Sequence, residues 1–467
     1  NTALGYTALQ ASDTASHNVA IGKAALLADT KGGQSVAVGA NALQTQNFTT
    51  ATNTLNVAVG YFAGQQVTTG QFNALVGGQA GDALTEGTRN IAIGTNALGA
   101  DTLGSKSVAI GVATLGDQNF TTATDAFNTA VGHGAGTAVT TGNLNTLIGG
   151  QAGDALTSGN NNIAVGYNAL GSDTLGDRAV AIGRGALENQ NFTTSTDNYN
   201  VAVGWAAGND VTTGQSNTLI GGNAGDALTD ADFNTAVGMG ALSSDTLGSE
   251  STAIGYLALN AANSSTATNA FNTAVGSRAG KSVTTATINT LIGGQAGDAL
   301  TEGNSNTAVG YDALGAETLG DRNVAVGNAA LKNQNNTTDT DSYNTAVGYY
   351  AGLSVTTGIR NTIIGGEAGD ALTTANDNVA VGALALSGDT LGAQSVAIGR
   401  GALKVQNFAT ATDTHNVAVG YSAGESMTTG ILNTLIGYAA GDKLTDADHN
   451  VVLGTNALGT DTLGSKS

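Results

Sequence analysis

Acidic residues recur in this sequence within a segment that could bind a cation. The segment Gly-Gly-Gln-Ala-Gly-Asp-Ala-Leu-Thr occurs at 77–85, 149–157 and 293–301, and it is close to a known calcium-binding nonapeptide. However, it returns every 72 residues rather than every nine, so successive copies cannot share an ion. We therefore expect its Asp to accept hydrogen bonds from turn amides. Calcium is the alternative near Asp82, Asp154, Asp226, Asp298, Asp370 and Asp442.

A second Asp lies 19 residues further on, as in Asp82 with Asp101, Asp154 with Asp173 and Asp226 with Asp245. Such a ladder of carboxylates could bind a cation or transfer protons. Because Lys, Arg and His are absent nearby and every copy is the same, we expect these residues to be solvated turn acids.

Other chemistry-bearing patterns are missing from the sequence. The four His residues, His17, His133, His415 and His449, share no metal-ligand spacing. We find no nucleophile elbow, phosphate-binding loop or zinc motif. A polysaccharide-cleaving β-helix would need an off-pattern cluster of acids and bases, and none occurs. The sequence therefore predicts a non-enzymatic protein with no catalytic residue, no metal site and no cofactor.

Composition and charge exclude several partners. The formal charge is −20, from 35 acidic and 15 basic residues, so no basic stripe is available for nucleic acid or for anionic lipid. No run approaches the roughly 18 apolar residues of a membrane span. Absence of Cys excludes disulfides and thiolate metal sites. We expect no nucleic-acid partner and no membrane insertion within this segment.

The element that would position every side chain is a repeated pentad, represented by Asn-Val-Ala-Val-Gly at 56–60. It occurs 26 times, with steps of 17 residues and every fourth time of 21. Four steps make a 72-residue super-repeat, and super-repeats start near 56, 128, 200, 272, 344 and 416. Such periodicity indicates a solenoid. We expect 1–467 to be one continuous array that extends beyond this segment.

Strand, rather than helix, is the structure that the pentad predicts. Gly recurs too often for helices and the apolar residues lack helical spacing, whereas short strands separated by Gly and Asn turns fit an all-β fold. We expect about two strands per coil and a stack of Asn side chains from coil to coil. The fifth-position glycines should need either a positive φ or the close approach of a neighbouring backbone; examples are Gly22, Gly39, Gly60, Gly94, Gly132, Gly204, Gly276, Gly348 and Gly420.

Both faces of the predicted strands are apolar. Position 2 of the pentad carries mainly Val, Ile or Thr, position 4 carries Val, Ile or Leu, and position 3 carries Ala in most copies and Leu or Ile in others. A coil has only one lumen to fill, so the second face needs a partner. We expect lateral self-association, most simply of three chains around an axis.

The pentads resemble those of a known family. Ser-Val-Ala-Ile-Gly at 107–111 and 395–399 is similar to the head repeat of trimeric autotransporter adhesins. Asn-Thr-Ala-Val-Gly-Tyr-x-Ala at 306–313 and 344–351 resembles repeats of phage and bacterial tail-fibre-like proteins. The adhesin repeat is shorter, and no neck or stalk occurs here. The resemblance implies a left-handed parallel β-roll, here with 17- and 21-residue coils, in an adhesin, fibre or filament on a cell or virion surface.

Aromatic side chains are the candidate contacts with a receptor. One row follows the pentad Gly every 72 residues and includes Tyr61, Trp205, Tyr349 and Tyr421. It could pack against the next chain or stack on glycans. The 21-residue coils carry Phe48, Phe120, Phe192 and Phe408, replaced by Ser264 and Asn336 in two copies, which we interpret as a variable surface. A glycan- or ice-binding module is the alternative function, with Thr pairs as its surface: Thr68-Thr69, Thr140-Thr141 and Thr212-Thr213.

Overall fold

The computed structural model describes residues 1–464 and 466, and the regular structure of these residues is entirely β, with no helix. The chain divides into two compact units, Asn1–Phe233 and Asn234–Ser467. Each unit is a parallel β-solenoid in which successive coils stack through one main sheet. The predicted fold class is therefore confirmed, whereas the single continuous array and the left-handed coil stay predictions.

In the first unit, every main-sheet strand covers positions 2 to 4 of a pentad. Neighbouring strands are parallel and in register, so that Ala58 lies opposite Leu75 and Leu75 opposite Ala92. The strands are β1 (Thr2–Leu4), β2 (Val19–Ile21), β4 (Val36–Val38), β6 (Val57–Val59), β7 (Ala74–Val76), β8 (Ile91–Ile93), β10 (Val108–Ile110), β12 (Thr129–Val131), β13 (Thr146–Ile148), β14 (Ile163–Val165), β16 (Val180–Ile182), β18 (Val201–Val203) and β19 (Thr218–Ile220).

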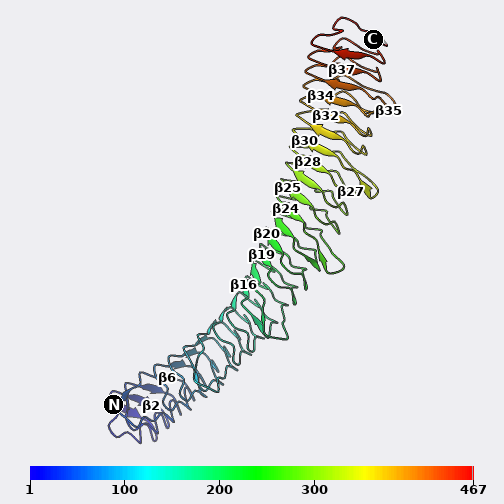
Figure 1. Cartoon of the computed structure of the whole chain (residues 1–467). Helices are drawn as coiled ribbons and strands as arrows, with labels where there is room; N and C mark the ends of the chain where they lie inside the picture. The colour runs from blue at the N-terminus through cyan, green and yellow to red at the C-terminus, as the bar shows by residue number, and fades with distance from the viewer. Residues whose placement is uncertain (465, 467) are drawn as a thin grey trace. The chain divides into compact units, whose positions relative to one another are not determined.

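The second unit repeats this arrangement, and Figure 1 shows its strands stacked side by side. The strands are β20 (Thr235–Val237), β22 (Thr252–Ile254), β24 (Thr273–Val275), β25 (Thr290–Ile292), β26 (Thr307–Val309), β28 (Val324–Val326), β30 (Thr345–Val347), β31 (Thr362–Ile364), β32 (Val379–Val381), β34 (Val396–Ile398), β36 (Val417–Val419), β37 (Thr434–Ile436) and β38 (Val451–Leu453).

The expectation of two strands per coil is wrong. A typical 17-residue coil holds one strand of three residues, and the rest of the coil is turn. The reason lies in left-handed residues: in the coil at 56–72, Phe62, Gly64 and Phe72 all have a φ near +60°. A strand cannot continue through such a residue, because left-handed φ values bend the chain.

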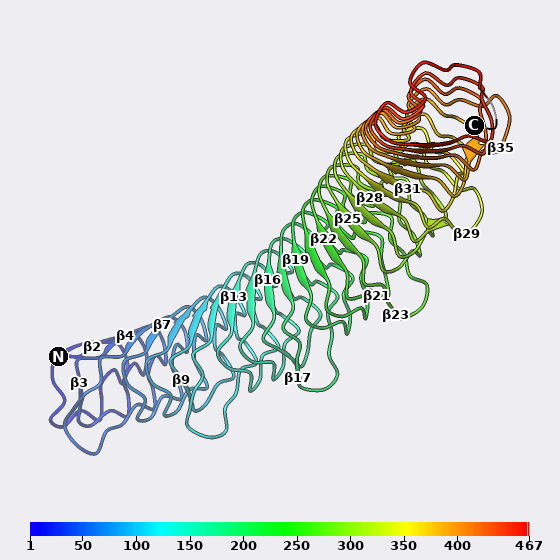
Figure 2. The ribbon, with the colours of Figure 1, turned by 45° about the horizontal axis from the view of Figure 1, so that its top comes forward.

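In each 21-residue coil the extra residues form a long loop, and a two-residue strand at the end of this loop pairs with a two-residue strand of the preceding coil. In the first unit the pairs are β3 (Gly32–Gly33) with β5 (Thr52–Asn53), β9 (Gly104–Ser105) with β11 (Thr124–Asp125) and β15 (Gly176–Asp177) with β17 (Thr196–Asp197). In the second unit they are β21 (Gly248–Ser249) with β23 (Thr268–Asn269), β27 (Gly320–Asp321) with β29 (Thr340–Asp341) and β33 (Gly392–Ala393) with β35 (Thr412–Asp413). Figure 2 shows these loops projecting beyond the other coils, for example next to β17 and β23.

The lumen of the coil is filled by small and medium apolar side chains. Outside the first and last coils, the residue at pentad position 3, which is the middle residue of each strand, is fully buried, as for Ala58 and Leu75. The Ala three residues past the pentad Gly is fully buried as well, as for Ala63 and Ala80. Because Leu or Ile takes the place of Ala in every fourth coil, larger and smaller side chains of neighbouring coils pack against one another. The residues at pentad position 3 therefore form the core, and the residues at pentad positions 2 and 4 point outward.

The predicted Asn stack is confirmed. Asn73 donates from Nδ2 to the carbonyl oxygen of Gly87 at 2.9 Å, and its main-chain N–H donates to Oδ1 of Asn56 at 2.9 Å. Asn90 repeats the pattern one coil later. Each of these side chains thus closes its own coil with its amide nitrogen and binds the next coil with its oxygen.

Both predicted reasons for the pentad glycine apply together. Gly60 has a φ of +147°, and a Cβ there would collide with the carbonyl oxygen of Gly77 in the next coil. The same holds for Gly132 against Gly149 and for Gly348 against Gly365. Any other residue would therefore be strained and would also separate the coils.

Candidate interaction surface

The outer side of the main sheet carries exposed apolar side chains on every coil. The residues at pentad positions 2 and 4, which are the first and last residues of each strand, point away from the lumen. Val57 and Val59 of β6, for example, are each 37% exposed. Position 4 is Val, Ile or Leu throughout, and position 2 is Val, Ile or Thr except at Ala74. The centre of this surface is thus a flat double row of mainly β-branched residues.

One edge of the surface is formed by the residue that precedes each pentad. This residue always has a left-handed φ, for example +53° at Leu55 and +59° at Phe72. The conformation turns its side chain outward beside the sheet. The exposed apolar members are Leu55, Phe72, Phe127, Leu144, Tyr199 and Phe233 in the first unit, and Phe271, Ile288, Tyr343 and Leu432 in the second.

The opposite edge is formed by the residue that follows the pentad Gly. The predicted aromatic row lies here: Tyr61, Trp205, Tyr349 and Tyr421 are 45–58% exposed. Further aromatic residues from other coils extend it, namely Tyr6, Tyr167, Tyr256, Tyr311 and Tyr438. The two edge rows and the two strand rows together are called the outer face below.

Almost all of the large hydrophobic side chains that are exposed among the described residues lie on the outer face. Every exposed large hydrophobic side chain among them lies on it except Val405 and Leu463. Soluble monomers rarely expose contiguous apolar patches above a few hundred Å². A face this extended in each unit is typical of an interaction surface.

Charge is distributed unevenly between the outer face and the rest of the chain. Among the described residues 1–464, acids occur on the outer face only at Glu250 and Asp377, although the chain carries a formal charge of −20. All four His residues lie on its edges. Bases occupy the edges at Lys23, Arg89, Lys106, Arg178, Arg184, Arg322, Arg360 and Arg400.

Several of these bases stack on neighbouring rings and pair with acids of the long loops. Arg89 lies 5.4 Å from the ring centre of Phe72, and Lys106 lies 4.8 Å from that of Phe127. The Lys106 Nζ also lies 2.6 Å from Oδ2 of Asp125. Cation–π contacts and ion pairs of this kind hold long side chains flat against the surface.

The four Phe residues are not on a surface, so that prediction is wrong. Phe48, Phe120, Phe192 and Phe408 are 4–6% exposed. Each packs inside the base of its long loop; Phe408, for instance, lies against Gly392. The substitutions that suggested variability, Ser264 and Asn336, are also buried, and Asn336 makes hydrogen bonds to Glu317 and Ser342 in place of the ring contacts. The exposed part of the loop is Thr-rich, as at Thr49 and Thr50.

The expected ladder of solvated acids is also wrong, because the second Asp of each pair is buried. Asp101 accepts hydrogen bonds from the N–H groups of Gly104 and Phe120 and from Nε2 of Gln118. Asp173 has the same three kinds of donor. Burial raises the pKa of both carboxyls, and the hydrogen bonds oppose this in part. Each carboxylate anchors a long loop from inside the lumen.

The Asp residues considered for calcium lie half-buried in turns. Burial raises the pKa of Asp82, Asp154, Asp226, Asp298 and Asp370. One oxygen of Asp154, Asp226 and Asp370 is buried without a hydrogen-bond partner. Among residues 1–464 and 466, no three His, Asp or Glu side chains are grouped as metal ligands would be. The sixth, Asp442, lies beside Lys443, with Nζ 3.4 Å from Oδ2.

The Thr pairs form a ladder rather than a free surface. Thr68 donates its hydroxyl to the carbonyl oxygen of Thr85, which in turn donates to that of Thr102. Thr140 and Thr157 repeat this arrangement. The hydroxyls of Thr68 and Thr140 are therefore occupied in joining coils, whereas Thr69 and Thr141, like Thr140 itself, are exposed.

The comparisons with known proteins identify no relative: no family model, curated protein or solved structure matches the chain. The part of the chain that the structure describes includes no helix able to span a membrane.

The sequence pattern could have revealed most of the outer face. The strand rows and the aromatic row follow directly from the pentad. The other edge was missed, although Leu55, Phe72, Phe127 and Leu144 stand at one fixed offset before the pentad. Bulky residues are uncommon at positive φ, and for that reason the offset does not suggest an outward-facing row.

Proposed function

We propose that this chain is a structural segment of an extracellular fibre, filament or adhesin whose outer face is covered by further copies of the same chain, most simply in a homotrimer. The observation that carries the proposal is the gathering of exposed apolar side chains on one side of each unit. Burial of apolar area at about 25 cal/mol per Å² drives association. The role is non-enzymatic and needs no cofactor.

A second copy fits this face better than an unrelated globular partner. Rows of side chains repeat at about 4.8 Å along each unit, and another solenoid of the same chain has the same spacing. Long parallel contacts between identical chains can thus continue coil after coil. Cyclic association also lets one edge row of a chain meet the opposite edge row of the next.

Electrostatics favours the same arrangement. Carboxylates are nearly absent from the outer face, so copies that meet there avoid the repulsion that the acidic turns would cause. The bases on its edges are partly neutralised within their own chain, as in Lys106 with Asp125, Arg178 with Asp197 and Arg322 with Asp341. Such pairs carry little net charge into an interface.

The backbone explains why such a chain would serve as a stiff element. Main-chain hydrogen bonds, Asn side chains and Thr hydroxyls all run from coil to coil. The long loops stand away from the outer face and leave exposed Thr side chains for contacts with a receptor. The pentad resemblance to adhesin and tail-fibre repeats supports a place on a cell or virion surface.

Charged substitutions on the outer face test the proposal. Ile364 and Ile398 occupy pentad position 4, and each side chain is 38% exposed. Val405 is 43% exposed but lies outside the outer face. The double variant Ile364→Glu, Ile398→Glu should lower the assembled fraction at micromolar concentration, because a carboxylate buried without a partner costs several kcal/mol. Val405→Glu should assemble normally. Equal assembly of both variants, by light scattering, would contradict the proposal.

A further inference from the structure

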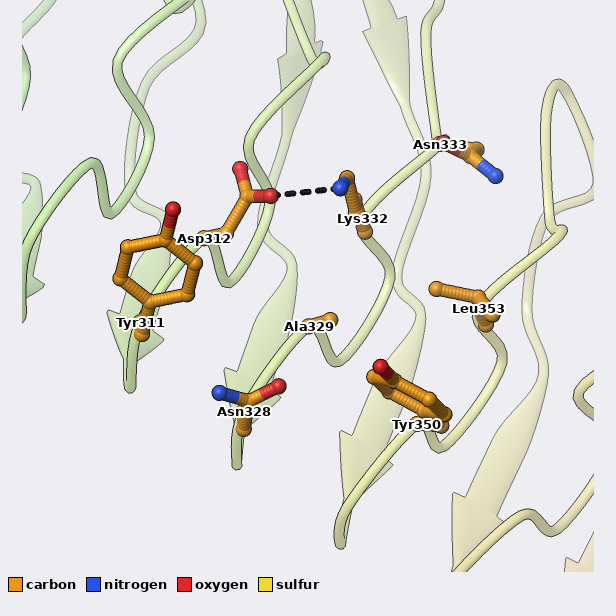
Figure 3. Close-up of a pocket in the computed structure, with 8 residues that line it drawn as sticks. All are labelled: Tyr311, Asp312, Asn328, Ala329, Lys332, Asn333, Tyr350 and Leu353. Carbon is orange, nitrogen blue, oxygen red and sulfur yellow. Dashed lines mark ion pairs between the residues drawn. The ribbon is translucent and has the colours of Figure 1, made fainter.

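A shallow groove crosses three coils of the second unit, on the turns that follow β26, β28 and β30 (Figure 3). Its volume is about 290 Å³, near the lower end of the range of about 300–1,000 Å³ for small-molecule sites. Its lining residues are Tyr311, Asp312, Asn328, Ala329, Lys332, Asn333, Tyr350 and Leu353.

The groove exists because a small residue lies between two larger ones at one coil position. Asp312, Ala329 and Tyr350 hold this position in successive coils, with φ values of 58°, 52° and 57°. Their shared left-handed conformation directs the three side chains alike, and the Ala329 methyl leaves the centre open. Main-chain hydrogen bonds fix the spacing: Ala329 donates to Tyr311 at 2.9 Å and Tyr350 to Asn328 at 3.0 Å.

Two tyrosine rings stand at opposite ends of the groove, with Asn328 and Ala329 between them (Figure 3). Tyr350 is stacked on Tyr349, with ring centres 3.9 Å apart and planes at 24°. Tyr311 lies beside Gly294, where a Cβ would be 3.5 Å from the ring. The Tyr350 ring is thus supported within its own coil and the Tyr311 ring by the preceding coil, so both are largely preorganised for a ligand.

Polar groups converge between the rings. The Lys332 Nζ lies 2.8 Å from Oδ2 of Asp312, which holds both side chains over the groove. Asn328 and Asn333 add amide donors and acceptors at its margins. A rigid carboxylate next to amides can bind adjacent hydroxyl groups, and an aromatic ring packs on the C–H face of a sugar ring.

This set of residues is specific to one super-repeat. One super-repeat earlier, the places of Tyr311, Asp312, Lys332 and Tyr350 are taken by Met239, Gly240, Asn260 and Arg278. One later, they are taken by Ala383, Leu384, Lys404 and Ser422. The coil geometry is the same in all three, so the solenoid itself does not require these side chains.

We propose that this groove binds one neutral pyranose residue of a glycan. The rings of Tyr311 and Tyr350 pack on its C–H groups, and the Asp312 carboxylate and the two Asn amides bind its hydroxyls. The groove is complete within one chain, but Tyr311 and Asn328 belong to one edge of the outer face, so the proposal requires that further copies leave this part of the edge open.

Saturation-transfer NMR on the full chain with methyl glucoside, methyl galactoside and methyl mannoside tests the proposal. We expect transfer to at least one of these pyranosides. Tyr311→Ala, Tyr350→Ala and Asp312→Asn should each weaken its binding by about tenfold or more, which corresponds to about 1.4 kcal/mol. Tyr311→Phe, which keeps the ring, should weaken binding less than Tyr311→Ala does.

Tyr167→Ala is the matched control. Tyr167 occupies the coil position of Tyr311 two super-repeats earlier, is 53% exposed against 56%, and lies beside Gly150 as Tyr311 lies beside Gly294. Its removal should leave binding unchanged. The proposal is overturned if the unmodified chain shows no transfer to any of the three sugars, or if Tyr167→Ala weakens binding as much as Tyr311→Ala does.

Discussion

Gln118 donates from Nε2 to Oδ2 of Asp101 at 2.6 Å, across two successive coils and in the interior of the solenoid. Gln118 also accepts from Nδ2 of Asn128 through its own oxygen, at 2.9 Å. The buried carboxylate is thus linked to the Asn stack through one side chain. The other Asp101 oxygen accepts the main-chain N–H of Gly104 in its own coil and that of Phe120 in the long loop of the next coil. No basic residue takes part in this network.

Removal of this carboxylate should loosen the long loop. Asp101→Ala would leave the N–H groups of Gly104 and Phe120 without this acceptor, at about 1–3 kcal/mol for each buried group, and would leave the Gln118 amide only the Ser107 hydroxyl. We expect faster hydrogen exchange across residues 118–126. Asp117→Ala, at an exposed acid of the coil that carries the long loop, is the control. Unchanged exchange in Asp101→Ala would show that the carboxylate does not hold the loop.

The buried acids should give an unusual dependence of stability on pH. Burial raises the folded-state pKa of Asp101, Asp173 and Asp389. Their contribution to stability is therefore complete below the unfolded-state pKa of about 3.9 and is lost as pH rises through the folded-state pKa. Asp377 has the opposite shift, since its hydrogen bond to Arg360 lowers its pKa, but that exposed pair contributes little.

We therefore expect the melting temperature to rise when pH is lowered from 7 toward about 4. Circular dichroism at constant protein concentration measures it. Replacing the three acids by Asn should flatten the profile. A melting temperature that falls steadily over this range in the unmodified chain would contradict the assignment.

Replacement by Ala should destabilise the chain strongly at a pentad glycine and very little at a glycine that directly follows one. Gly348→Ala would force a left-handed conformation at φ +144° and a clash with the Gly365 carbonyl, whereas a Cβ at Gly366 meets nothing within 4 Å. We expect Gly348→Ala to cost about 2–5 kcal/mol and Gly366→Ala to be nearly neutral. Hydrogen exchange in β30 and β31 distinguishes them. Similar exchange in both variants would mean that coil spacing can adjust.

The sequence predicted the features that repeat and missed those that depend on contacts between coils. Gly60 and Asn73 follow from the pentad, because their partners are the same residues one coil away. Asp101 was misjudged because acids are usually exposed, and its donors come from a loop about 19 residues further along. Phe120 was misjudged because Asn336, its counterpart, satisfies the same site with hydrogen bonds to Glu317 and Ser342 instead of a ring.

Trp205 offers an internal probe of the outer face. It is the only Trp in the chain, and it is 55% exposed within one copy. If further copies cover the outer face, the fluorescence emission of Trp205 should be blue-shifted, and acrylamide should quench it poorly. The double variant Ile182→Glu, Ile220→Glu, on the neighbouring strands β16 and β19, should shift the emission to the red. Val405→Glu should leave it unchanged. Efficient quenching of Trp205 in the unmodified chain would contradict coverage of this edge.

The mass of the unmodified chain in solution tests the central claim most directly. One chain has a mass of 45.7 kDa, and sedimentation velocity at micromolar concentration separates one copy from several. We expect a multiple of this mass, with three copies as the predicted number. A folded, stable species with the mass of a single chain would mean that the outer face needs no second copy, and it would contradict the proposed role in a self-associated fibre.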